Sequence, residues 1–300
     1  MPFTQAHQLA ATLLGITPCR STLVRLSQFY GDCIEIELNR PDTPTDTPTD
    51  TPADTPTIVY GMSDGLMLHI DGAWKEVKLG RIFSQSDLQS SAVEDRAGQI
   101  NASLYIARVG HCDQFWTPWQ AHLLPFQPLG SDLVLVNDGA PWMAHRQQRD
   151  FGQATPILDY YHVLEHLAVV SRAAMGREKS RSIWLSKQAN RLLASELDDI
   201  LADLLLLKRG QSERDKALAY LEQNRYRMDY KTYRERGLCI GSGAIESANG
   251  GVVQQRLKRP GQRWSRVGAQ RILNLRCCWM SDRWHLIESH LRPASWAMAS

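Results

Sequence analysis

Cysteine is scarce in this sequence, and none of it is arranged in pairs that bind zinc. Six cysteines occur in 300 residues, and no two have the C-x-x-C spacing of a zinc module. Their scatter also argues against a disulfide framework and fits a reducing compartment. We therefore expect a cytoplasmic protein without disulfides or structural zinc.

Long apolar runs are absent as well. No stretch of 18 or more apolar residues occurs, so we expect no transmembrane helix and no membrane partner. The first residues lack the basic region and the cleavage site of a signal peptide. With 43% hydrophobic and 22% charged residues, the composition instead indicates a globular protein with a sizeable core.

Basic residues are concentrated near the C-terminus. The whole chain carries a formal net charge of only +2, but the segment from Lys231 to Ser300 contains twelve basic and four acidic residues. Such an excess favours a polyanionic partner, because neutralising phosphates releases counterions. A solvated basic surface explains the charge alone equally well.

A low-complexity repeat divides the sequence near its start. Residues 42–57 read DTPTDTPTDTPADTPT, and proline at this density predicts a solvated, extended loop. Before the repeat, Ala6–Leu14 has a helical pattern. The last six residues of Ser27–Leu38 alternate between polar and apolar, which predicts a half-buried strand.

Strand patterns follow the repeat. A strand begins at Ile58 and reaches Asp64, and Asp71-Gly72 is the strongest signal for a two-residue hairpin turn. The stretch WKEVKLGRIF then returns as the second strand, and NASLYIARVG predicts a third. Two later apolar runs, in SDLVLVNDGA and TPILDYYH, predict further strands, the first of them a buried parallel strand. FWTPWQAHLLPF is predicted to be a helix or a turn packed by its aromatic residues, and PWMAHRQQRDF is a predicted helix.

The remainder of the chain has a helical pattern from Val163 to Arg236, and another helix follows the turn Gly241-Ser242-Gly243. Adjacent strands followed by alternating strands and helices predict an α/β fold with a mixed sheet flanked by helices. The predicted segments are an N-terminal segment (1–41), the repeat loop (42–57), a first part of the core (58–162), a helical insertion (163–236) and a last part that completes the core and carries the basic C-terminal segment (237–300).

Three carboxylates are candidates for metal-dependent chemistry. Asp138 follows the apolar run Leu133–Val136, and ligands bind at the ends of such strands. Asp64 lies within or at the edge of the first strand, where a half-buried carboxylate needs a partner such as a divalent ion. Glu246 lies in the first turn of the helix after the glycine turn. The alternatives are a turn aspartate before glycine and a helix-start glutamate that interacts with the helix dipole.

The stretch DYYHVLEHL contains Asp159, His162 and His166. The two histidines are four residues apart, a helical spacing that can bind zinc. The sequence H-V-L-E-H is not H-E-x-x-H, however, and no third ligand is evident. We therefore favour a structural histidine pair, or a hydrogen bond between Asp159 and His162.

The stretch RLKRPGQRWS combines basic residues with an aromatic one. Arginine and lysine bind phosphates, and tryptophan can stack on an unpaired base. The candidate DNA-binding residues are Arg256, Lys258, Arg259, Arg263 and Trp264. A basic helix end with a tryptophan in the core is the alternative.

Taken in order, these motifs resemble those of the ISKra family of insertion-sequence transposases, which is related to mutator-like transposases. The matching motifs are SDG followed by W-x-E-x-K-x-G, then NDGAPW, ILDYYHVLEHL, IGSGAIES and RLKRPGQRW, and they extend from about Val59 to Met280. Each motif is weak alone, but the ordered set is fairly specific. The resemblance implies an RNase H-like core interrupted by a helical insertion.

The resemblance also implies a DDE triad, which falls on Asp64, Asp138 and Glu246, with Asp159 and His162 matching the D-x-x-H signature as supporting residues. Such a triad binds two Mg²⁺ ions, or Mn²⁺ in their place, about 4 Å apart for in-line phosphoryl transfer. The implied activity is cleavage and strand transfer of double-stranded DNA, both transposon ends and target. A homo-oligomer on DNA and association with the nucleoid are implied in the same way.

The N-terminal part departs from the family pattern. Only 63 residues precede Asp64, and about a quarter of them are the repeat, so no convincing helix-turn-helix fits there. We therefore expect an N-terminally shortened copy. A catalytically inactive DNA-binding remnant and a metal-dependent nuclease remain alternatives, and a glycosidase with paired carboxylates is a remote one.

Overall fold

The computed structural model describes residues 3–38, 58–89, 99–124 and 132–291. The predicted repeat loop, 42–57, lies outside these residues. The chain divides into two compact units: unit 1 is Met1–Leu133 with Ala244–Ser300, and unit 2 is Val134–Gly243. Unit 2 thus includes strands as well as the predicted helical insertion.

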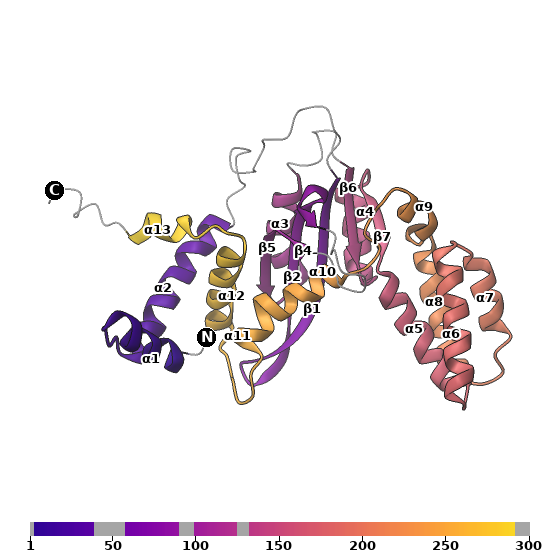
Figure 1. Ribbon diagram of the computed structural model, residues 1–300, viewed down its shortest axis with the longest axis horizontal. Coiled ribbons are helices and arrows are strands. Elements are labelled where there is room, and N and C mark those ends of the chain that lie inside the picture. The colour runs from indigo at the N-terminus through magenta and orange to yellow at the C-terminus, as the bar shows by residue number, and fades with distance from the viewer. Residues whose placement is uncertain (1–2, 39–57, 90–98, 125–131, 292–300) are drawn as a thin grey trace. The chain divides into compact units, whose positions relative to one another are not determined.

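The fold is α/β, as the sequence predicts, with a mixed five-stranded sheet flanked by helices (Figure 1). Unit 1 contains its antiparallel part, in the order β5-β2-β1, and unit 2 contains its parallel pair, β6 and β7. These strands are β1 (Ile58–Ile70), β2 (Ala73–Ser84), β5 (Leu104–Val109), β6 (Asp132–Asn137) and β7 (Thr155–Leu158). A separate two-stranded sheet consists of β3 (Leu88–Gln89) and β4 (Gln99–Ile100).

The hairpin of β1 and β2 has the predicted turn. Asp71 and Gly72 both have positive φ angles, 51° and 79°, as the tight primed turns of two-residue hairpins require. Asp64 lies inside β1, opposite Leu79 on β2, and is therefore a strand residue and not a turn residue.

The helices of unit 1 are α1 (Phe3–Leu14), α2 (Arg20–Leu38), α3 (Cys112–Leu123), α10 (Gly243–Ala248), α11 (Gln255–Leu257), α12 (Arg266–Met280) and α13 (His285–Leu291), with the 3₁₀ turn η2 (Gln85–Asp87) and the π-helical segment η5 (Asn249–Gln254). In unit 1, α3 and α12 pack on the sheet, and α2 packs on α12. α3 packs on β2, where Gly80 leaves room for an aromatic pair. A Cβ on Gly80 would lie 2.4 Å from the ring of Trp119 and 3.1 Å from that of Phe115.

The prediction of a strand in Ser27–Leu38 is wrong, because these residues form the second half of α2. α2 packs closely on α12 at Gly31, where a Cβ would lie 2.7 Å from the Cβ of Arg271. The Arg271 guanidinium also binds both carboxylate oxygens of Asp32, at 2.6 and 2.5 Å. Contacts with α12 therefore outweigh the local alternation, since strand propensity is a context-dependent preference.

The helices of unit 2 confirm the helical pattern predicted from Val163 to Arg236. They are α4 (Pro141–Asp150), α5 (Tyr160–Ala174), α6 (Glu178–Leu193), α7 (Leu197–Leu205), α8 (Gln211–Asn224) and α9 (Tyr230–Glu235), with the 3₁₀ turn η4 (Arg225–Arg227). α5 packs against α6 and α8 (Figure 1). Its buried residues Val163, Leu167 and Val170 follow the helical spacing of a core-facing stripe.

Among the described residues, no helix combines the length and the apolar character that crossing a membrane requires.

We predict that Gly31→Val lowers the free energy of unfolding, because the new side chain cannot fit between α2 and the backbone and Cβ of Arg271. Overpacking of this kind costs roughly 1–3 kcal/mol. Urea unfolding would measure the loss. Gly176→Val is the control, because a Cβ there meets no atom within 4 Å. Equal losses for the two variants would contradict close packing at Gly31.

Candidate active site

The helix that bears Glu246 is fixed to the sheet of unit 1 by contacts on both sides of that residue. Nη1 of Arg81, a buried residue of β2, donates to the carbonyl of Ala244 at 2.8 Å. One turn after Glu246, Nδ2 of Asn249 donates to Oδ2 of Asp64 on β1 at 2.5 Å. These two hydrogen bonds hold α10 and the first residue of η5 against neighbouring strands.

The side chains of Arg81 on β2 and Asp64 on β1 project from the same face of the sheet. Across the β1–β2 pair, Met62 is opposite Arg81 and Asp64 is opposite Leu79. Side chains of directly opposed residues share a face, and so do residues two apart on one strand. α10 therefore lies along the face from which the Asp64 carboxylate projects.

Glu246 is one of two exposed residues between Ala244 and Asn249. Ile245 and Ala248 are buried, whereas Glu246 and Ser247 are exposed. Asn249 follows Glu246 by three residues, a spacing that places side chains beside each other on a helix. The structure thus brings the helical turn of Glu246 to the Asp64 carboxylate within unit 1.

Asp138 belongs to unit 2, where it directly follows β6 as predicted. Its carboxylate is half-buried, and Oδ1 accepts a hydrogen bond from the backbone N–H of Ala140 at 3.1 Å. Its carbonyl accepts from the hydroxyl of Tyr220 at 3.0 Å. The next residue, Gly139, has a φ of 90°, and a Cβ there would lie 2.8 Å from the Tyr220 hydroxyl. The backbone around Asp138 is therefore closely constrained.

A buried polar network supports this strand end. Oδ1 of Asn137 accepts from Nη1 of Arg227 and from the backbone N–H of Gly139, each at 3.0 Å. Its Nδ2 donates to Gln147 at 2.9 Å. Arg227 is only 1% exposed, and its burial lowers its pKa below the ordinary arginine value. The network makes the residue before Asp138 a rigid support.

Asp159 is the N-cap of α5, since its Oδ1 accepts from the backbone N–H of Tyr161 at 3.0 Å. Ser242 donates its hydroxyl to Oδ2 at 2.6 Å and its backbone N–H to Oδ1 at 3.2 Å. Burial raises the pKa of Asp159, and the hydrogen bonds from Ser242 partly oppose this. Asp159 therefore joins the start of α5 to the segment that precedes α10.

The histidines of α5 form the structural pair that the sequence favoured. The rings of His162 and His166 are perpendicular with centroids 5.0 Å apart, and His166 stacks on Tyr220 at 4.0 Å. Burial lowers the pKa of His166, with the charge of His162 as a second cause. Nδ1 of His162 lies 3.4 Å from a carboxylate oxygen of Glu165. These contacts are aromatic packing and a polar contact between His162 and Glu165.

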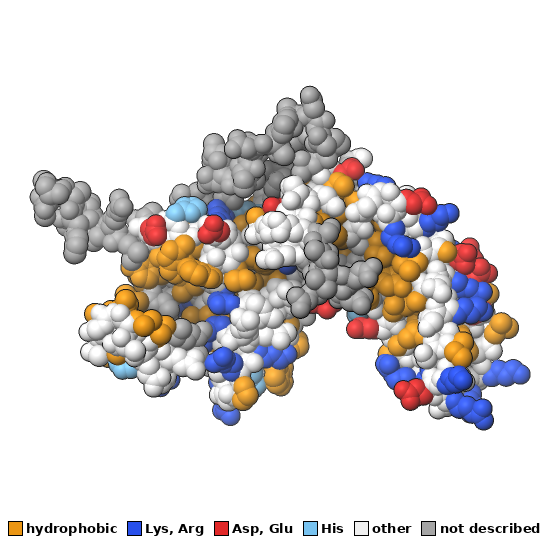
Figure 2. Space-filling view, in the orientation of Figure 1, with side chains coloured by type: hydrophobic (Ala, Val, Ile, Leu, Met, Phe, Trp, Pro, Cys, Tyr) orange, Lys and Arg blue, Asp and Glu red, His pale blue; other side chains and the backbone are white. Residues whose placement is uncertain are grey.

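The predicted DNA-binding residues divide into two groups. Lys258, Arg259 and Arg263 are exposed at or near the end of α11, and Figure 2 shows Lys and Arg side chains at the surface of this region. Arg256 is buried, with its guanidinium between the rings of Phe3 and Trp264 at 4.9 and 5.0 Å. Its burial favours a packing function for Arg256 over a phosphate contact.

The connection between α11 and α12 is fixed to the tip of the β1–β2 hairpin. The backbone N–H of Asp71 donates to the carbonyl of Trp264 at 2.8 Å, and Oδ1 of Asp71 accepts from the backbone N–H of Arg266 at 3.1 Å. A hydrogen bond to Lys75, and the one from Arg266, lower the pKa of Asp71. Trp74 on the same hairpin is 62% exposed. The basic connection and the hairpin tip thus form one surface.

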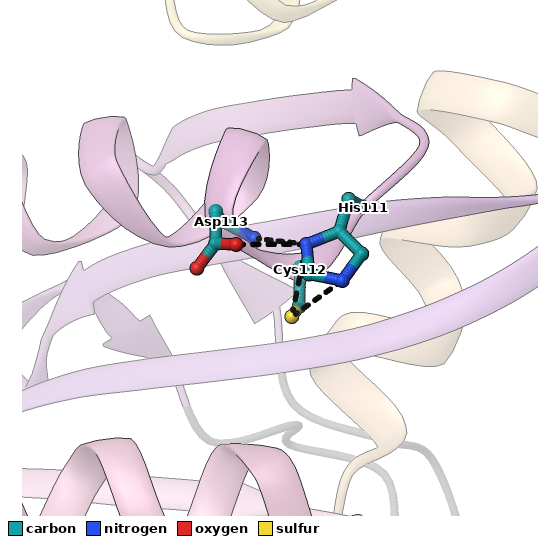
Figure 3. A group of neighbouring side chains, drawn as sticks. All are labelled: His111, Cys112 and Asp113. Carbon is teal, nitrogen blue, oxygen red and sulfur yellow. Dashed lines mark hydrogen bonds and ion pairs between the residues drawn. The ribbon is translucent and has the colours of Figure 1, made fainter.

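A further group of potential metal ligands lies at the start of α3. Ligand atoms of His111, Cys112 and Asp113 lie within 4.8 Å of one another (Figure 3). Nδ1 of His111 is 2.8 Å from Oδ2 of Asp113 and caps the helix by accepting from the Asp113 N–H. Sulfur and imidazole ligands suit zinc better than magnesium, and the positive end of a helix dipole disfavours a cation. This group does not match the predicted magnesium ligands.

The residues around Asp64 fit a hard divalent cation. Asp64 and Glu246 provide carboxylate oxygens, and Oδ1 of Asn249 is buried without a hydrogen-bond partner among the described residues. Amide and carboxylate oxygens are the ligands that Mg²⁺ and Mn²⁺ accept. The third predicted ligand, Asp138, lies in unit 2.

Sequence reasoning missed four residues that hold these carboxylates in place. Arg81 and Asn249 position the Glu246 helix, Tyr220 contacts the backbone of Asp138, and Ser242 binds Asp159. Only Asn249 had a usable signal, its position one helical turn after Glu246. The others are brought into contact by tertiary structure alone.

Comparison with known proteins gives no relative of this chain: no family model matches the sequence, and no curated protein does.

We predict that Asp159→Asn changes how stability depends on pH. A carboxyl group whose pKa in the folded protein is raised above 3.8 destabilises the fold progressively as pH rises from that value through the raised pKa. Asparagine does not ionise, so the free energy of unfolding of the variant, relative to the wild-type protein, should increase with pH in this window. Urea unfolding at a series of pH values measures it.

Asp203→Asn is the control of opposite sign. Although burial acts to raise the pKa of Asp203, hydrogen bonds from Lys187, Gln188 and Arg191 lower it to about 2. This variant should lose stability relative to the wild-type protein as pH rises from about 2 to 3.8. The same direction of change for both variants would contradict the raised pKa of Asp159.

Proposed function

We propose that this protein is a DDE-type DNA transposase that cleaves and joins DNA strands with divalent metal ions. The hydrogen bond between Asn249 and Asp64 carries the proposal, because it places the helical turn of Glu246 at the Asp64 carboxylate. The ordered motifs that resemble the ISKra family add independent support from the sequence. An RNase H-like catalytic core is part of the same proposal.

In this account Asp64, Asp138 and Glu246 hold Mg²⁺, or Mn²⁺ in its place. When bound, two such ions activate the attacking oxygen and stabilise the leaving oxygen of an in-line phosphoryl transfer. The attacking group is water during cleavage and a DNA 3′-hydroxyl during joining. The contribution of the protein is to hold the carboxylates in place, Asp64 through Asn249 and Asp138 through the backbone N–H of Ala140.

The DNA partner is supported by the exposed basic residues of the α11–α12 connection. Lys258, Arg259 and Arg263 are exposed beside a hairpin whose tip carries Trp74. Cations neutralise phosphates, and an exposed aromatic ring suits an unpaired base. This surface belongs to the same unit as Asp64 and Glu246.

A catalytically inactive DNA-binding remnant is the second candidate function. It requires only the basic surface and predicts normal affinity for DNA without metal-dependent cleavage. A nuclease that cleaves DNA without joining it is separated from a transposase by the absence of strand-transfer products.

We predict that Glu246→Gln abolishes Mn²⁺-dependent cleavage of plasmid DNA and leaves affinity for a double-stranded oligonucleotide nearly unchanged. The amide keeps the shape of the side chain but removes the negative charge that strengthens the binding of a divalent cation. Glu288→Gln, an exposed position on α13, is the control and should cleave normally. Full activity of Glu246→Gln refutes the proposed triad. Inactivity of the wild-type protein favours the DNA-binding remnant.

We predict that replacing Lys258 and Arg259 together by alanine weakens DNA binding and flattens its dependence on salt. Each lost phosphate contact lowers the slope of log affinity against log salt by about 0.9, so the double variant should lose about 2. Fluorescence anisotropy at several salt concentrations measures this slope. Lys208 and Arg209, an exposed pair in unit 2, are the matched control. An unchanged slope means that this connection does not touch DNA.

A further inference from the structure

Asn249 is buried beside the Asp64 carboxylate. Among the described residues, its amide nitrogen has a hydrogen-bond partner and its amide oxygen has none. Its side chain is 4% exposed. Nδ2 donates to Oδ2 of Asp64, whereas Oδ1 has no hydrogen-bond partner among the described residues. Buried polar atoms are satisfied in almost all proteins, so an unpartnered acceptor next to a carboxylate calls for a ligand.

The orientation of the amide follows from the chemistry of its neighbour. An ionised carboxylate only accepts hydrogen bonds, so the amide nitrogen, and not the oxygen, must face Asp64. Both atoms belong to one planar amide group. The unpartnered oxygen therefore lies within about 5 Å of the Asp64 carboxylate, a separation that one cation or its hydration shell spans.

The backbone changes its type of helix at Asn249. The α-helix that contains Glu246 ends at Ala248, and a π-helical segment begins at Asn249. π-helical turns shift the side chains that follow and occur frequently at functional sites. Here the change of helix type begins at the residue that contacts Asp64.

We propose that Asn249 is a positioning residue of the metal site: its amide nitrogen fixes the Asp64 carboxylate, and its amide oxygen binds the divalent cation that Asp64 holds, directly or through a water of its hydration shell. The inference rests on the proposed function, since it concerns the same site. It assigns to this site a fourth group, Asn249, from the same helical turn as Glu246.

The test is the affinity of the full-length protein for Mn²⁺, measured by electron paramagnetic resonance without DNA. Asn249→Leu keeps the branched shape but removes both polar atoms, and Asn249→Ala guards against overpacking by the larger leucine. Mutation of a residue that orients a metal ligand typically lowers metal affinity 10–100-fold. Both variants should therefore bind Mn²⁺ about tenfold more weakly. Their thermal stability should fall as well, because both variants lose the hydrogen bond from Asn249 to Asp64, so the affinity for Mn²⁺ is the deciding measurement.

Gln270→Ala is the structural control. Gln270 bonds to Ala107, Val109 and Asn274 on the α12–β5 side of unit 1. This variant should lose stability and keep its affinity for Mn²⁺. A residue of purely structural function at position 249 would behave in the same way.

Asp64→Asn separates failure of the inference from failure of the proposed function. If Asp64→Asn weakens Mn²⁺ binding and the Asn249 variants bind as the wild-type protein does, the inference is overturned and the proposed function stands. If Asp64→Asn also binds Mn²⁺ normally, no metal site exists at Asp64, and both are overturned.

Discussion

The metal site proposed for this protein depends on the placement of one short helix on one face of a sheet. A helix of six residues such as α10 is marginal without tertiary contacts. Two polar contacts hold it in place: the buried Arg81 guanidinium at Ala244, and the Asn249 amide at Asp64. The apolar residues Ile245 and Ala248 are buried, whereas Glu246 remains exposed on the helix that Asn249 joins to β1.

In unit 2, hydrogen bonds hold the backbone at Asp138 in place. Asp138 follows β6, which is buried from Leu133 to Asn137. Its backbone is held by Tyr220 and by the network of Asn137, Gln147 and Arg227. Preorganised carboxylates of this kind suit metal chemistry, because their geometry does not have to be created when an ion binds. The Arg227 guanidinium donates hydrogen bonds to the amide oxygens of Asn224 and Asn137, and these bonds offset part of the cost of burying it.

Local patterns predicted much of the fold, and tertiary contacts decided the rest. The turn at Asp71-Gly72 and the buried strand before Asp138 were predictable, because positive φ angles and apolar runs are read directly from neighbouring residues. The end of α2 was not, because its helical state depends on Arg271, which lies 239 residues away from Asp32. Asn249 and Asp64 are 185 residues apart, so their hydrogen bond could not be foreseen either. For the site, the sequence thus indicated the carboxylates and missed the residues that hold them.

The central claim is that Asp64, Asp138 and Glu246 hold divalent ions in common, and the most direct test is a crystal structure with Mn²⁺ located by its anomalous scattering. The account predicts ions about 4 Å apart, with Asp64 and Asp138 each within coordination distance and Glu246 completing the set. Ions bound elsewhere, such as at His111 and Cys112, with none at Asp64, would contradict it.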